Sequence, residues 1–334
     1  MLTRAFEWFY WLFALSLIPG VLVWLWLAAG MPLEMSQLIL PAELTYNRVI
    51  NYLGIPGAIF LPSDSSILPT GGVLFRLCAI YDEPGTVGTI AALCLAVTRF
   101  RIWDIRGALS LAAGIMSFSL AFAILGVIGF AAMMIAEKRW KLILVSSVSV
   151  IIGVVILSGV VFDSGAPQTP PITVPSDPTE SASGKDTQVK ADPKQFDIGR
   201  RVSLRWFSLT DNRATPEMRA LFAKYADSSL GTLLFGIASN ASIIYGRESA
   251  VWFTILTDYG LVGFVWLFLL YLAPVFLLWR TGRLDFSVIL FCVLYLMSFY
   301  QRPVIWLPAQ MLIYFAGIYW LAREQRLPMR PAST

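Results

Sequence analysis

The sequence contains no histidine and is poor in charged residues. Only 14% of the 334 residues are charged, whereas soluble domains have about 25%. Hydrophobic residues make up 57% of the chain, and its mean hydropathy is +0.70. This composition predicts a polytopic membrane protein. Histidine is the commonest general base and the commonest metal ligand, so its absence removes both from the candidate site residues. We also expect no metal site and no cofactor.

The cysteines and the net charge give no sign of a paired-cysteine motif or of nucleic-acid binding. Cys78, Cys94 and Cys292 lie in or beside apolar runs and form no CxxC pair, so we interpret them as small packing residues. The net charge of +4 is too small to indicate nucleic-acid binding. We therefore expect no nucleic-acid partner.

Apolar runs alternate with short basic clusters along the chain. The clusters are Arg4, "RFRIWDIR", "EKRWK", "RTGR" and "REQR". Lys and Arg collect in cytoplasmic loops, so all five clusters should lie on the same side of the membrane. This is possible only if the run from Gly107 to Ala136 is a hairpin that turns at Ser117 to Ser119. The arms are then short and need local bilayer thinning. We predict an all-α bundle of about eight spans with both termini cytoplasmic.

Three regions follow from this topology. Residues 1–162 hold the first membrane helices and the loop with the "EPG" motif. The prolines and glycines of residues 31–72 predict an extramembrane loop with interfacial pieces. Residues 163–250 form a large outward loop, and residues 251–334 hold the last helices. Within the loop, 163–195 is rich in proline and serine and is predicted to be disordered, while 196–250 carries arginines and is partly helical.

One amphipathic helix is predicted inside the large loop. Thr215 and Pro216 suit the N-cap and first position of a helix. Leu221, Phe222 and Tyr225 share one helical face. We expect this short helix to lie on the outer surface of the membrane.

Four motifs occur in a fixed order between residues 70 and 275. They are "R…YDEPGTVG" (76–88), "GRRVSLRW" (199–206), "LLFGIASN" (233–240) and "ESAVWFTILTDYGLVGF" (248–264). Their order and placement resemble the superfamily of O-antigen ligases and Wzy-type polymerases, which would place the chain in a bacterial inner membrane with the large loop in the periplasm. The chain is short for this family, and its hairpin turn lacks the arginine or glycine often found beside the serine. The ligase branch has a histidine in the large loop, so the resemblance favours the polymerase branch.

The resemblance implies a metal-independent glycosyltransferase. Its substrate would be an oligosaccharide repeat unit on a polyprenyl diphosphate, and membrane lipid, a chain-length regulator and a flippase would be its other partners. Diphosphate is already a good leaving group, so the transition state needs positive charge near the departing oxygens. Arginine suits this because it is permanently charged and binds phosphate in a bidentate manner.

The resemblance assigns seven candidate residues. The candidate catalytic residues are Glu83, Arg201 and Arg205, and the candidate substrate-binding residues are Arg76, Arg200, Arg247 and Asp258. Each also has a simpler interpretation. The arginines at 200–205 would form a headgroup-binding patch, Glu83 would interact with a helix dipole, Arg76 would extend to the headgroups, Arg247 would pair with Glu248, and Asp258 would cap a helix.

Other functions stay open at this point. A lipid-linked glycan transporter or flippase would need polar residues at mid-membrane depth and internal repeats, and the centres of the apolar runs carry no charge. Glycan transfer of the O-antigen ligase type and a non-catalytic role in a polysaccharide export complex are the remaining alternatives.

Overall fold

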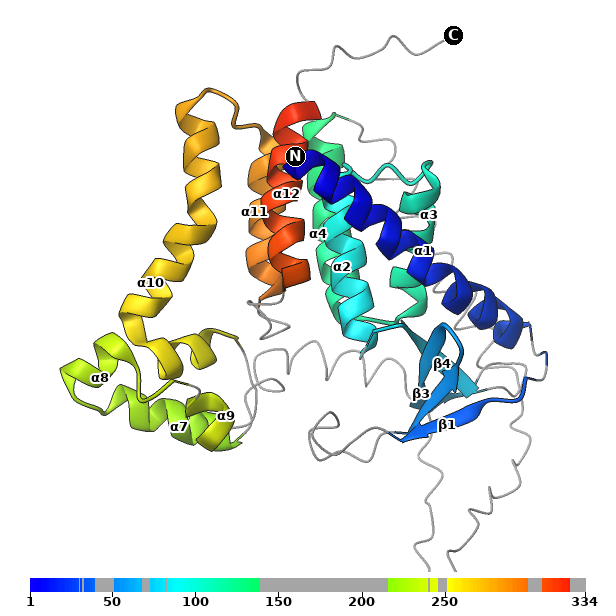
Figure 1. Ribbon diagram of the computed structural model, residues 1–334, viewed down its shortest axis with the longest axis horizontal. Helices are drawn as coiled ribbons and strands as arrows, with labels where there is room; N and C mark the ends of the chain where they lie inside the picture. Colours follow the sequence, from blue (N-terminus) through cyan, green and yellow to red (C-terminus); the bar gives the residue numbers. More distant parts are fainter. Residues whose placement is uncertain are drawn as a thin grey trace, which may run out of the picture.

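The computed structural model describes residues 1–29, 31, 33–39, 51–67, 73–81, 83–138, 216–239, 241–245, 251–299 and 308–324. These residues are mostly helical, as predicted, and include one four-stranded antiparallel sheet (Figure 1). The candidate arginines Arg200, Arg201, Arg205 and Arg247 lie outside the described residues, as does the predicted disordered segment 163–195.

Seven helices of the described residues form the bundle. They are α1 (Leu2–Ala28), α2 (Pro84–Val97), α3 (Ile105–Met116), α4 (Leu120–Ala136), α10 (Val251–Arg280), α11 (Phe286–Ser298) and α12 (Pro308–Glu324). They correspond to seven of the eight apolar segments predicted from the sequence, and the eighth, 142–162, lies outside the described residues. Helix α2 is central: it contacts α3, α4, α11 and α12, and every one of its residues except Gly85 is buried.

Two of these helices, α1 and α10, are long and apolar enough to cross a bilayer by length and composition. Only 28% of the most apolar window of α1 and 22% of that of α10 is buried. The core helix of a soluble protein would be largely covered, so the exposed apolar surface indicates membrane association. Helices α2, α3, α4 and α11 are apolar but shorter.

The run from Gly107 to Ala136 folds as the predicted pair of helices. Helix α3 ends at Met116 with Ser117 as its C-cap, and α4 begins after its N-cap Ser119; Phe118 lies between the caps at a φ of 46°. Helix α4 runs back toward the residues before α3, because Gly129 of α4 packs against Phe100, which precedes α3. The break at Ser117 to Ser119 is therefore confirmed.

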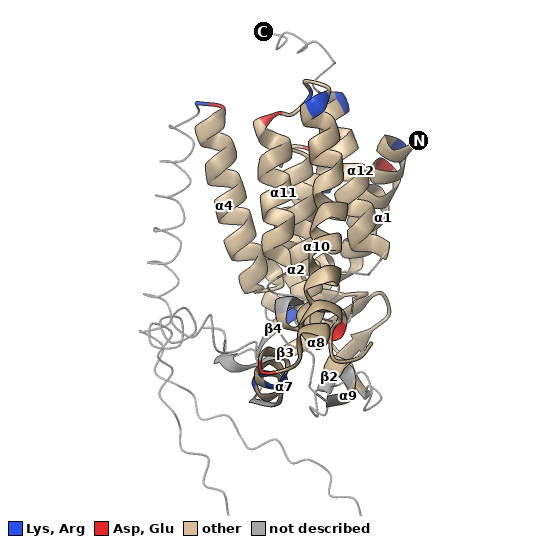
Figure 2. Cartoon of the chain, turned by 90° about the vertical axis from the view of Figure 1, so that its left-hand side faces the viewer, with Lys and Arg blue, Asp and Glu red and all other residues tan. Residues whose placement is uncertain are grey.

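Most Lys and Arg residues of the described part of the chain gather at one end of the bundle (Figure 2). We call this the basic end; it contains the start of α1, the α2–α3 link (98–104), the end of α4, the α10–α11 link (281–285) and the end of α12. Two contacts join its parts: Arg99 Nη2 lies 3.4 Å from Asp285 Oδ2, and Arg323 Nη1 donates to Thr3 Oγ1 at 2.9 Å. This grouping agrees with the single-sided basic clusters predicted from the sequence.

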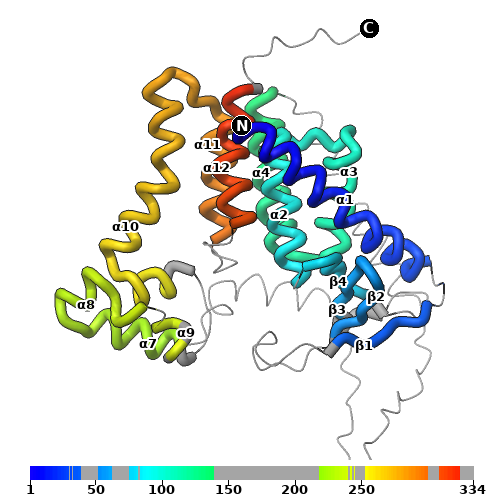
Figure 3. Tube along the Cα trace, in the orientation of Figure 1, coloured from blue at the N-terminus to red at the C-terminus, as the bar shows by residue number. Residues whose placement is uncertain are grey.

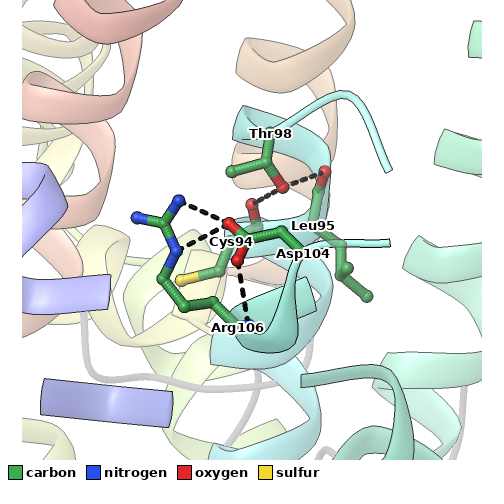
Figure 4. Close-up of polar contacts among 5 residues, drawn as sticks. All are labelled: Cys94, Leu95, Thr98, Asp104 and Arg106. Carbon is green, nitrogen blue, oxygen red and sulfur yellow. Dashed lines mark hydrogen bonds and ion pairs between the residues drawn. The ribbon is translucent and has the colours of Figure 1, made fainter. Parts of the chain in front are cut away.

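A network of polar contacts fixes the α2–α3 link at the basic end (Figure 4). Asp104 caps α3 by accepting from the backbone N–H of Arg106 at 3.4 Å, and it also pairs with the Arg106 guanidinium. That guanidinium lies 5.2 Å from the ring centroid of Tyr10 and 5.0 Å from that of Trp11, both in α1. Cation–π contacts of this kind hold a cation against apolar surface. Arg106 therefore links α3 to α1.

The four-stranded sheet corrects the all-α prediction. Its strands β1 (Ser36–Ile39), β2 (Asn51–Ile55), β3 (Ala58–Ile67) and β4 (Val73–Ala79) pair antiparallel in sequence order. Residues 31–72 were predicted to be an extramembrane loop because of their prolines and glycines, and no strand was predicted there. One such pair, Pro56–Gly57, is instead the two-residue turn between β2 and β3, where Gly57 has a φ of 77° and proline favours the preceding turn position.

The sheet covers the end of the bundle opposite the basic end. Trp24 of α1 donates from Nε1 to the Phe75 carbonyl of β4 at 2.8 Å. Gly20 of α1 faces Leu77 and Ala79 so closely that a Cβ there would lie 2.6 Å from the Leu77 side chain. We call this the sheet end; it contains β1–β4, the start of α2 and the turn at Ser117 to Ser119.

Three short helices pack against the first turns of α10 (Figure 1): α7 (Pro216–Ala226), α8 (Leu230–Phe235) and α9 (Ala241–Tyr245). The helix predicted to begin at Pro216 is confirmed. Its apolar face packs within the protein, because Leu221 and Tyr225 are buried and the Phe222 ring meets that of Phe253 at 4.5 Å. Its location on the outer surface of the membrane stays a prediction.

Candidate functional site

Arg76 and Glu83 flank the link between β4 and α2. Arg76 lies in β4, opposite Leu61 of β3, and Glu83 is the N-cap residue of α2, directly before Pro84 at the first helical position. Glu83 has extended backbone angles and its carboxylate makes no capping hydrogen bond. The side chain of Glu83 is exposed and that of Arg76 is half-buried. The link thus presents a carboxylate at the surface of the sheet end.

The serine turn between α3 and α4 holds Arg76 in place. Arg76 Nε donates to the Ser117 carbonyl at 3.3 Å. The turn is fixed in its own right, because Ser117 Oγ donates to the Gly114 carbonyl at 2.7 Å and accepts from the Ser119 N–H at 3.3 Å.

Gly88 lets the same turn approach α2. A Cβ at Gly88 would lie 2.5 Å from the Ser119 Cβ and 2.7 Å from its Oγ. Both Ser117 and Ser119 are buried. The serines and the "EPG" motif each stand out in the sequence, but the contact between Gly88 and Ser119 joins residues 31 positions apart and has no local signal.

Tyr81 belongs to the same link. Its hydroxyl lies 3.4 Å from Ser16 Oγ of α1. Burial raises the pKa of the Tyr81 phenol, and the hydrogen bond to Ser16 opposes this shift. The phenol is therefore neutral at pH 7 and adds no negative charge beside Glu83.

Asp258 is used inside the protein. One carboxylate oxygen accepts from the Ser242 N–H at 2.7 Å and the other accepts from Ser242 Oγ at 2.8 Å. Asp258 is buried, and these two bonds satisfy it while tying α9 to α10. The geometry favours the capping interpretation of Asp258 over contact with a substrate, and Ser242 is the partner that sequence reasoning missed.

Two glycines join the motifs "LLFG" and "TDYG". Gly236 has a φ of 89° and Gly260 a φ of 66°. A Cβ at Gly236 would lie 2.4 Å from the Asp258 carbonyl oxygen, and a Cβ at Gly260 would lie 2.4 Å from the Leu234 carbonyl. The Ile237 N–H donates to the Thr257 carbonyl at 2.7 Å. These motifs therefore meet backbone to backbone.

The structure thus brings together Arg76, the serine turn and the start of α2 with Glu83. Asp258 forms a separate cluster with Ser242 beside α8 and α9. Arg200, Arg201, Arg205 and Arg247 lie outside the described residues, and their roles stay predictions. No protein-family model matches this chain, and searches of the curated proteins and of the solved structures find no match either.

Proposed function

We propose that this chain is a multi-pass protein of the bacterial inner membrane that polymerises oligosaccharide repeat units carried on polyprenyl diphosphate. The observation that supports this is the separation of charges. Arg76 and Glu83, from the first motif of the resemblance, lie at the sheet end, while the basic clusters gather at the other end. If the basic end faces the cytoplasm, the sheet end faces the periplasm, where the lipid-linked donor is delivered.

In the proposed reaction, a hydroxyl oxygen of the acceptor unit attacks the anomeric carbon of the donor chain. The bond between that carbon and the diphosphate oxygen breaks, and the electron pair leaves with the diphosphate. The hydroxyl proton passes to a carboxylate or to the departing diphosphate. Because the leaving group gains negative charge in the transition state, fixed cations beside it accelerate the reaction.

Arg76 and Glu83 fit two of these needs. The guanidinium of Arg76 is oriented before any substrate arrives, because its Nε is bonded to the Ser117 carbonyl, and such preorganisation is what electrostatic catalysis requires. Glu83 carries an exposed carboxylate on the same link, suited to accept the acceptor proton. Arg201 and Arg205 remain the proposed diphosphate clamp, on sequence grounds alone.

A variant series in cells tests this proposal. Arg76→Lys, Arg201→Lys and Arg205→Lys each keep the charge but lose the planar fork, and Glu83→Gln keeps the shape but loses the charge. Loss of one transition-state contact should lower the rate about 100-fold, equivalent to about 3 kcal/mol. The readout is the glycan profile at equal membrane levels of protein, with single repeat units accumulating on lipid.

Matched controls come from the basic end. Arg283→Lys and Glu7→Gln change exposed residues of the same types and should leave the glycan profile unchanged. Normal polymer from all four test variants would reject the proposed roles of these residues and leave a lipid-binding patch. Loss of repeat units from the periplasm, with accumulation in the cytoplasm, would instead indicate a transporter.

A further inference from the structure

The elbow of α10 marks one boundary of the hydrocarbon layer. Gly260, with φ 66° and ψ −170°, interrupts the helix. The part from Leu261 to Arg280 is about 30 Å long at about 1.5 Å per residue, which matches the thickness of a bilayer core. Its far end reaches Arg280 at the basic end. The elbow at Gly260 therefore lies at the level where α10 leaves the hydrocarbon.

Helix α8 is held at this level. Its C-cap residue, Gly236, meets the backbone at Asp258 and Tyr259, and Gly260 meets Leu234 and Gly236. Because these contacts join backbone atoms, α8 cannot move away from the elbow without breaking them. Figure 3 shows α8 beside the end of the long part of α10.

The exposed surface of α8 is apolar. Leu230 is 72% exposed and Phe235 is 68% exposed, and the segment from Leu230 to Phe235 contains no charged residue. Next to it along α10, directly after the elbow, Leu261 and Val262 are exposed as well. Helix α8, with its exposed apolar residues, is thus in contact with a candidate membrane-spanning helix that is itself exposed and apolar.

We infer that α8 inserts into the outer interface of the bilayer, with Leu230 and Phe235 between the lipid headgroups and the first acyl carbons. Moving two such side chains out of water is favourable. α7 has a different role, because its apolar residues Leu221 and Tyr225 are already covered by protein. Since α8 carries no basic residue, its insertion does not depend on anionic lipid. This inference does not use the proposed reaction.

Depth-resolved quenching tests this inference. The native cysteines Cys78, Cys94 and Cys292 are buried, so a cysteine introduced at Phe235 can be labelled selectively with an environment-sensitive fluorophore. The full chain is then placed in nanodiscs of zwitterionic lipid that carry nitroxides near the glycerol or near the chain end. Two control variants are labelled in the same way: Lys224→Cys, at an exposed residue of α7, and Trp266→Cys, at an exposed residue of α10.

The label at Phe235 should be quenched several-fold more by shallow nitroxides than the label at Lys224, and several-fold less by aqueous iodide. The label at Trp266 should respond most to the deep nitroxides, which reports that the helix is inserted in the disc. If the label at Phe235 matches that at Lys224 in both quenchers, α8 lies in water and the inference is wrong. Protection from both quenchers would indicate a protein partner and would equally overturn it. Leu230→Cys repeats the test at the other end of α8.

Discussion

Substituting Gly260 with alanine should destabilise the protein by several kcal/mol, far more than the same change at Gly282. Both glycines have nearly the same positive φ, 66° and 67°. At Gly260 a Cβ would lie 2.4 Å from the Leu234 carbonyl and 2.5 Å from the Gly236 nitrogen, whereas at Gly282 it would meet nothing within 4 Å. Gly282→Ala is therefore a control for the positive φ alone, whereas Gly260→Ala adds a less accessible ψ of −170° and steric overlap.

The magnitudes follow from these two effects. An alanine with a left-handed φ costs about 1–2 kcal/mol, and the lower entropy of the unfolded chain returns about 0.4–1 kcal/mol, so Gly282→Ala should cost about 1 kcal/mol or less. At Gly260 the φ/ψ pair is accessible essentially to glycine alone, which costs about 1–3 kcal/mol. The overlap with backbone atoms adds about 1–3 kcal/mol more.

Equilibrium unfolding in mixed detergent micelles measures both variants. Gly260→Ala should shift the midpoint strongly, and limited proteolysis should show early cleavage between α8 and α10, because the contact at the elbow is lost. Equal destabilisation by the two variants would refute the close backbone approach of "LLFG" and "TDYG" on which the position of α8 depends.

Three further predictions concern other parts of the chain. Ser242→Ala removes the Oγ bond to Asp258 and should cost about 1–3 kcal/mol in unfolding free energy; no loss of stability would show that this bond does not hold α9. A cysteine at Phe118, which is exposed in the serine turn, should react with an impermeant maleimide from the periplasm, and one at exposed Lys138 only after lysis; the reverse pattern would exclude the proposed topology. Burial raises the pKa of Tyr81 in the folded state, so the unfolded chain loses the phenol proton first and the free energy of unfolding falls as the pH rises above the unfolded pKa of about 10. Tyr81→Phe should reduce this loss of stability at high pH. An unchanged dependence of stability on pH would contradict the prediction.

The helices could be predicted from the sequence because their signals are local. Uninterrupted apolar runs fix where α1, α4 and α11 lie, and Pro84 and Pro216 mark where α2 and α7 begin. The break at Ser117 to Ser119 followed from requiring the basic clusters to share one side. The grouping of those clusters at the basic end is consistent with the same reasoning.

The sheet and the contacts at the site could not be predicted in this way. Strand β1 has only four residues, and it pairs with β2, which begins at Asn51. The proline and glycine of the β2–β3 turn are equally typical of a loop. The Arg76–Ser117 bond joins residues 41 positions apart, and Asp258 meets Ser242 across 16 positions. Such pairs depend on how helices pack, and periodicity in one sequence carries no information about them.

The proposed activity is tested most directly with the purified chain. The protein in nanodiscs would be incubated with polyprenyl-diphosphate-linked repeat units and no metal, and the products separated and weighed by mass spectrometry. The account predicts lipid-linked glycans that grow by whole repeat units, with one polyprenyl diphosphate released for each unit joined. Repeat units that stay single while wild-type protein is folded and inserted would contradict it.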